Sequence, residues 1–162
     1  MFFEKLVQVP LRIPASVCNL EKYIGGLLKD DEELAGEFAR VINTLVKNPT
    51  PLSIKRFINT MYLYRNAFNG VDGTDGESLA MLLAAVILEI EDAQGFNAVA
   101  NCAQGGEAHF EEKLEEAQGS LDQKSQVLWG NLSDLWHDES AAGTNLNVAM
   151  RGAFISWLQK LS

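Results

Sequence analysis

Residues 79–90 form the longest apolar stretch of the chain, and this stretch constrains the fold more than any other feature. Its apolar side chains are nearly continuous, which is typical of a helix that is buried on most of its sides. The stretch is shorter than the ~18 apolar residues that a membrane-spanning helix needs. We therefore expect a central buried helix that begins at Asp75 or Ser78 and ends near Ile90, and no membrane association.

Amphipathic periodicity predicts further helices in the first half of the chain. Asn19 can cap a short helix. Asp30 or Asp31 can cap a second helix, which Asn48-Pro49 would end. Residues 2–14 are different, because their partly alternating apolar pattern, interrupted by prolines, predicts a short or edge strand. No other segment carries a convincing strand pattern.

Helical periodicity continues in the more acidic second half. It predicts a helix over residues 107–118, a helix capped by Ser120, and a clearly amphipathic last helix over residues 145–161. The predicted fold class is therefore mainly α, a multi-helix bundle with at most one short N-terminal strand. We expect a single compact unit of three segments: an extended segment over 1–14, a helical region over 15–104 and acidic helices over 105–162.

The distribution of charge is uneven along the chain. Residues 38–71 contain no aspartate or glutamate, although the whole chain carries a net charge of −9. A basic segment in an acidic protein indicates a negatively charged partner. This partner can be a phosphate, a nucleic acid or an acidic surface of the same molecule. The window carries +5, which leaves −14 for the rest, and its cations are Arg40, Lys47, Lys55, Arg56 and Arg65.

The helix predicted after residue 50 carries three of these cations. Thr50 can cap it, with Pro51 at its first position, where proline is favoured. Lys55 and Asn59 are four residues apart and share a face, whereas Arg56 points to a different side. Arg65 lies on the apolar side by angle, so we expect it either to reach out to solvent or to pair with a carboxylate.

Two partners remain open for this basic helix. The turn at residues 50–53 offers backbone N–H groups that, together with Lys55, are suited to a phosphate. The alternative is that the cations bind the acidic helices of the same chain. Periodicity and charge alone favour this second interpretation.

Other kinds of site find little support in the sequence. Cys18, Cys102, His109 and His137 match no zinc-binding spacing. The chain has no Gly-x-Ser-x-Gly motif and no phosphate-binding P-loop motif. We expect no catalytic residue, no metal ligand and no cofactor held by this chain alone. Two isolated cysteines and the lack of a signal-peptide pattern favour a cytoplasmic protein with reduced, buried thiols.

Two motifs resemble segments of the KAP-type P-loop NTPases in order and spacing. Residues 3–14, FEKLVQVPLRIP, are similar to the run at the end of the family's nucleotide-binding core. Asn48-Pro49, with IKRFIN at residues 54–59, is similar to the element that opens a helix of the lid. The apolar helix over 79–90 and a turn at Phe96 fit the leucine-rich helix and the phenylalanine-containing turn that come next in the family. The resemblance covers roughly residues 2–100.

The resemblance implies that the chain is a helical lid and regulatory region of a KAP-type ATPase, with a role in bacterial defence. It would couple the nucleotide state to conformation, without being catalytic alone. ATP and Mg²⁺ would be held by the missing N-terminal P-loop core, which would be its partner. Lys55, Arg56 and Asn59 would be the nucleotide-binding residues of the lid. In the family an arginine follows Asn-Pro, and the resemblance implies that it senses the nucleotide. Thr50 stands at that position here, so this role is lost or has moved to Arg56.

A second hypothesis makes no use of nucleotide. The chain would be an acidic helical protein–protein interaction module, whose C-terminal helices bind a basic partner. The basic segment would then be occupied within the molecule. Binding of nucleic acid is disfavoured by the net charge of −9.

Overall fold

The computed structural model describes residues 19–29, 32–68, 76–136 and 144–162. Within these residues the chain forms eight α-helices and one 3₁₀ helix, and no strand. The prediction of a mainly α, multi-helix bundle is therefore confirmed. The predicted strand, the candidate caps Asp30, Asp31 and Asp75, and Cys18 and His137 lie outside the described residues.

The helices follow one another along the chain in two halves. The first half contains α1 (Leu20–Leu27), α2 (Glu32–Leu45), α3 (Pro51–Ala67) and α4 (Gly76–Glu91). The second half contains α5 (Ala93–Ala103), the 3₁₀ helix η1 (Glu107–His109), α6 (Phe110–Gln118), α7 (Gln123–Ser133) and α8 (Thr144–Leu161).

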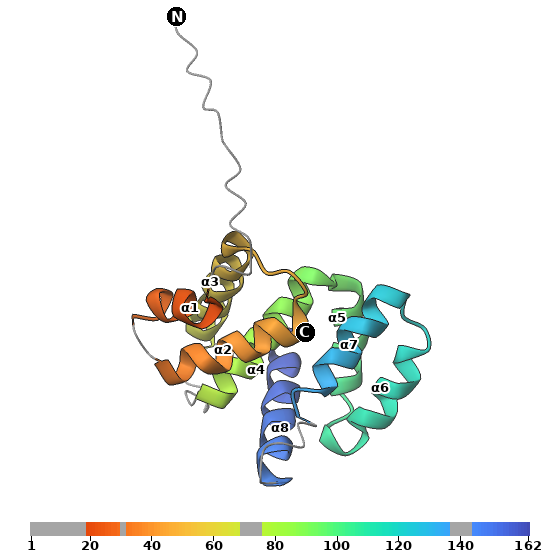
Figure 1. The fold of residues 1–162 in the computed structure, drawn as a ribbon. Helices are drawn as coiled ribbons and strands as arrows, with labels where there is room; N and C mark the ends of the chain where they lie inside the picture. The colour runs from red at the N-terminus through yellow and green to blue at the C-terminus, as the bar shows by residue number, and fades with distance from the viewer. Residues whose placement is uncertain (1–18, 30–31, 69–75, 137–143) are drawn as a thin grey trace, which may run out of the picture.

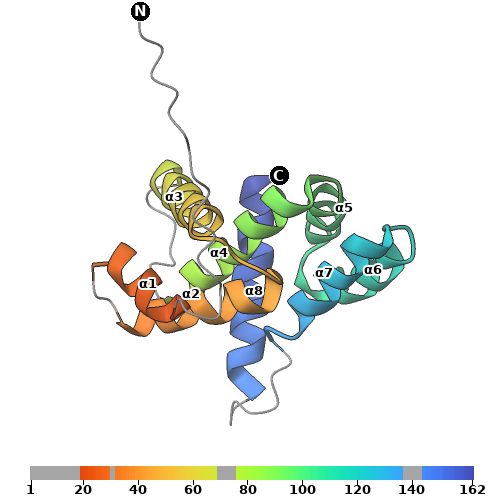
Figure 2. The same ribbon diagram turned by 45° about the horizontal axis from the view of Figure 1, so that its top comes forward.

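Helix α4 lies at the centre of the bundle, as its apolar sequence predicts. Residues 79–88 are all buried, and α2, α3, α5 and α8 all pack against α4. Both views show α1, α2 and α3 on one side of the α4–α8 pair and α5, α6 and α7 on the other (Figures 1 and 2). A helix covered from so many sides has no solvated face, which explains its nearly continuous apolar sequence.

Helix α8 is fixed to this centre by hydrogen bonds as well as by packing. The indole Nε1–H of Trp157 donates to the carbonyl oxygen of Ser78 at 3.0 Å and lies 3.1 Å from its Oγ. The amide of Gln159 donates to the carbonyl oxygen of Ala103 at 2.8 Å. Buried polar groups need such partners, so α8 has a defined position against α4 and α5.

Two local predictions in the second half are wrong. The family resemblance implies a turn that contains Phe96, but this residue is buried within α5, which Asp92 caps by accepting from the N–H of Gly95 at 2.9 Å. The sequence also predicts Ser120 as a cap, but the cap is Asp122, which accepts from the N–H of Ser125 at 2.8 Å. The hydroxyl of Ser120 donates instead to the carbonyl oxygen of Ala117, so it is engaged in the turn that ends α6.

Candidate functional site on the outer face of helix α3

The start of α3 is closed by a capping box. Thr50 has extended backbone angles, and its Oγ1 accepts from the N–H of Ser53 at 3.1 Å. In return, the N–H of Thr50 donates to Oγ of Ser53 at 2.9 Å. The predicted cap and the proline at the first helical position are thus confirmed.

This capping box changes the expectation for phosphate binding at residues 50–53. The N–H groups of Thr50 and Ser53 are engaged, and Pro51 has none. Among these four residues, only the N–H of Leu52 is not engaged in the capping box. The prediction that this turn offers a set of free backbone donors is therefore wrong, and an anion would have to meet side chains of the next turn.

The inner face of α3 is fixed to α4. It buries an apolar stripe of Ile54, Phe57, Ile58 and Met61. At the far end, the hydroxyl of Tyr64 donates to the carboxylate of Glu89, with oxygen–oxygen distances of 3.0 and 3.1 Å. Desolvation by burial, together with this neighbouring carboxylate, raises the pKa of Tyr64. The orientation of α3 about its axis is thereby set.

The outer face of α3 is a stripe of exposed residues, which we call the outer stripe: Leu52, Lys55, Arg56, Asn59 and Leu63. At 3.6 residues per turn these five positions fall within about 100° of arc. Leu52 is 79% exposed and Leu63 is 68% exposed. Lys55 and Asn59 share one side of this exposed stripe, whereas Arg56 lies at its other edge, about 100° from Lys55 around the helix axis.

Lys55 and Arg56 form no ion pair with the described carboxylates. The cause is local, because ion pairs on a helix form between residues three or four positions apart. Every such position around Lys55 and Arg56 holds a neutral residue, since residues 38–71 contain no acid. Both cations consequently face solvent.

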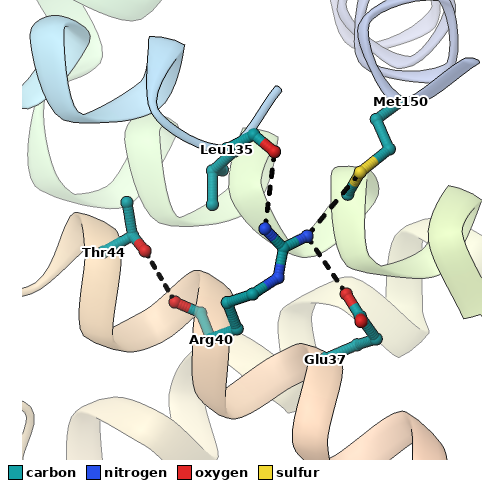
Figure 3. A network of polar contacts seen from close by, with 5 residues as sticks. All are labelled: Glu37, Arg40, Thr44, Leu135 and Met150. Atoms are coloured by element: carbon teal, nitrogen blue, oxygen red, sulfur yellow. Dashed lines mark hydrogen bonds and ion pairs between the residues drawn. The ribbon is translucent and has the colours of Figure 1, made fainter. Parts of the chain in front are cut away.

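Arg40, at the N-terminal end of the same acid-free window, behaves in the opposite way. Its guanidinium donates to the carbonyl oxygen of Leu135 at 3.4 Å and to the carboxylate of Glu37 at 3.2 Å, and lies 3.6 Å from the sulfur of Met150 (Figure 3). It joins α2 to the end of α7 and to α8. Arg40 thus has an intramolecular role, but its carboxylate partner Glu37 belongs to its own helix and not to the acidic helices of the second half.

Arg65 is half-buried, and its guanidinium lies 6.0 Å from the centre of the Tyr62 ring. It forms no ion pair with a described carboxylate. Arg65 lies in the last turn of α3, where its positive charge interacts favourably with the negative end of the helix dipole. This interaction stabilises the helix.

The acidic residues of the second half gather around η1 and α6. Arg151 of α8 binds two of them, Glu111 at 2.6 Å and Glu107 at 3.7 Å. The carboxylates of Glu115 and Glu116 stay exposed. This acidic helix lies on the opposite side of the bundle from α3 (Figures 1 and 2).

The described residues offer little other chemistry. Cys102 is buried, and its thiol contacts the carbonyl oxygens of Ala98 and Lys113. Burial raises the pKa of this thiol, which makes it a poor nucleophile at neutral pH. In the described part of the chain no cluster of His, Cys, Asp or Glu is arranged to hold a metal ion. None of the helices there is both long and apolar enough to cross a bilayer.

Comparison with known proteins gave no match to a family model, to a curated protein or to a solved structure.

Proposed function

We propose that this chain is the helical lid and regulatory region of a KAP-type P-loop ATPase that acts in the cytoplasm. It couples the nucleotide state to conformation and does not hydrolyse ATP alone. The observation that supports this proposal is the outer stripe of α3. At the positions matching the lid motif, Lys55 and Arg56 are exposed, without ion pairs to the described carboxylates.

The chemistry of these side chains suits the terminal phosphate of ATP. Phosphoryl transfer spreads negative charge over the phosphate oxygens, and positioned cations stabilise that charge. Lys55 supplies a flexible point charge, and Arg56 supplies a planar set of donors that matches a phosphate. Asn59 adds an amide one turn further along. The P-loop core, which this chain does not contain, would bind ATP and Mg²⁺ when present.

The test uses the polypeptide or complex that carries the P-loop core. The double variant Lys55→Ala, Arg56→Ala should lower the rate of ATP hydrolysis by on the order of 10²-fold, the effect of removing one well-placed charge-stabilising group. Lys22→Ala is the matched control, because Lys22 is an exposed helical lysine of α1. Turnover that is unchanged in the double variant, or a gene context without any P-loop core, would contradict the proposal.

A second candidate is an acidic protein-interaction module, favoured by the exposed carboxylates of α6. A lysine-rich peptide, monitored by fluorescence anisotropy, should then bind the chain. Its affinity should fall in Glu115→Gln, Glu116→Gln and persist in the equally neutralising control Glu21→Gln, Glu33→Gln. Equal losses in both double variants would indicate only nonspecific attraction to the net charge.

A further inference from the structure

The outer stripe of α3 combines apolar and positively charged side chains on one exposed helix face. Among the described residues, the exposed large hydrophobic side chains are Leu52, Leu63, Val127 and Val148. The two valines lie on different helices, whereas both leucines lie on this stripe, one before and one after Lys55 and Arg56. An exposed face that joins apolar and charged groups in this way is suited to contact with another protein surface.

Helix α6 carries a stripe of opposite charge and matching geometry, which we call the acidic stripe: Glu112, Glu115 and Glu116. All three side chains are exposed, and at 3.6 residues per turn they fall within about 100° of arc, as the outer stripe does. The adjacent pair Glu115 and Glu116 repeats the spacing of the adjacent cations on α3. Over its whole length α3 carries three cations and no acid, whereas α6 carries four glutamates and one lysine. The two helices are therefore complementary in charge.

The two stripes are too far apart to meet within one molecule. Helices α3 and α6 lie on opposite sides of the α4–α8 pair, with the core of the bundle between them (Figures 1 and 2). Two copies of the chain bring the stripes together when α3 of one copy meets α6 of the next. Such a contact joins two different surfaces, so every pair keeps one free stripe of each kind. Association of this type continues into a ring or an open chain.

We propose that the outer stripe of α3 docks on the acidic stripe of α6 in a second copy of this chain, in a head-to-tail assembly. This inference rests on the second candidate function, for which it names the basic partner. Lys55 and Arg56 meet the carboxylates, and Leu52 and Leu63 add apolar contact. The association is weak, because exposed ion pairs contribute little and each copy carries a net charge of −9. At physiological ionic strength the repulsion is largely screened beyond about 8 Å, whereas charges in contact are screened much less.

Sedimentation equilibrium at protein concentrations up to about 1 mM, a range that covers weak contacts, measures the association. The mass of the wild type should rise with concentration beyond that of a dimer. In Glu115→Gln, Glu116→Gln the association should be about tenfold weaker, the size expected for two exposed ion pairs. This variant also lowers the net negative charge, so a change in general repulsion alone would strengthen the association. The equally neutralising control Glu21→Gln, Glu33→Gln should associate at least as strongly as the wild type.

Substitutions on α3 test the other half of the contact. Lys55→Gln, Arg56→Gln should weaken the association by the same factor of about ten. Its control is Lys22→Gln, Lys47→Gln, which removes two exposed lysines elsewhere and gives the same net charge.

The apolar contribution is tested separately. Leu52→Ser, Leu63→Ser leaves the net charge unchanged and should also weaken the association. Val148→Ser changes an exposed apolar residue of α8 and should behave as the wild type. A leucine pair that associates like the wild type would show that the outer stripe is not the docking surface.

A mixture of the two charge variants tests the head-to-tail arrangement directly. Lys55→Gln, Arg56→Gln keeps an intact acidic stripe, and Glu115→Gln, Glu116→Gln keeps an intact outer stripe. Together they should form a one-to-one complex with the affinity of the wild-type contact, and this complex should not extend further. A mixture that associates no better than either variant alone would overturn the proposal, and so would a wild type that stays monomeric throughout. If the wild type is monomeric but a lysine-rich peptide binds α6, the second candidate function stands and this inference fails.

Discussion

Replacing Gly95 by alanine should destabilise the protein, although Gly95 lies inside helix α5, where alanine is normally preferred. In an open helical position this exchange stabilises by about 1 kcal/mol. Gly95 is buried, however, and a Cβ atom placed on it would clash with Oδ2 of Asp92 and lie 2.7 Å from Nε1 of Trp129. Both contacts are far closer than van der Waals contact, so both side chains would have to move.

Neither side chain is free to do so cheaply. The other oxygen of Asp92, Oδ1, accepts from the N–H of Gly95 at 2.9 Å and caps α5. Trp129 is fully buried in the core. Loss of a cap costs about 1 kcal/mol, and overpacking a core position costs about 1–3 kcal/mol. After subtraction of the gain in helix propensity, we expect a net destabilisation of about 1–3 kcal/mol.

Urea unfolding, monitored by far-ultraviolet circular dichroism, measures this effect. With an m-value of about 2 kcal/mol/M, the midpoint should fall by about 0.5–1.5 M. Gly130→Ala is the matched control, because Gly130 is helical, exposed and has no neighbour within 4 Å of an added Cβ. That variant should raise the midpoint slightly. A Gly95→Ala variant at least as stable as the wild type would refute the reasoning.

A double-mutant cycle locates the cause. In an Asp92→Ala background the carboxylate that meets the new methyl group is gone, and so is the cap. The additional cost of Gly95→Ala should therefore shrink, which gives a coupling energy between the two positions. Strictly additive effects would show that the contact with Asp92 is not the source of the destabilisation.

Two further predictions concern other polar contacts. Trp157→Phe removes the buried donor to Ser78 and should destabilise by about 1–3 kcal/mol in the same urea assay. The pKa of Asp122 is lowered by hydrogen bonds from Ser125, so its ionised form stabilises the fold above its unfolded pKa of about 3.8. The stability advantage over Asp122→Asn should be constant near neutral pH and disappear as pH falls through the lowered folded pKa. If the wild type stayed more stable than Asp122→Asn at pH values well below the folded pKa of Asp122, the prediction would be wrong.

Features that depend on local chemistry could be predicted from the sequence. Thr50 and Pro51 start α3 because a hydroxyl cap and a proline at the first position are favoured by the backbone of any helix. The burial of α4 agrees with its nearly continuous apolar residues. The exposure of Lys55 agrees with its place opposite the buried stripe of α3.

Features that depend on competition between partners could not be predicted in this way. Ser120 and Asp122 are both good caps, and the choice is decided by a turn in which the Ser120 hydroxyl bonds to Ala117. Arg40 and Arg56 are both cations of one acid-free window, yet only Arg40 lies where α7 and α8 bring acceptors to it. A signal for α5 is present, because Phe96, Val99 and Ala100 have helical spacing, but the glycine at 95 obscures it.

The composition of α3 is not the one that would best stabilise an isolated helix. A helix is stabilised by carboxylates in its first turn and by acidic residues three or four positions before its cations. α3 has no acid in its first turn and none anywhere along its length. By contrast, Arg151 of α8 is held by two carboxylates from η1 and α6. A carboxylate beside Lys55 or Arg56 would stabilise α3, but it would also neutralise the two cations that the proposed function assigns to the terminal phosphate.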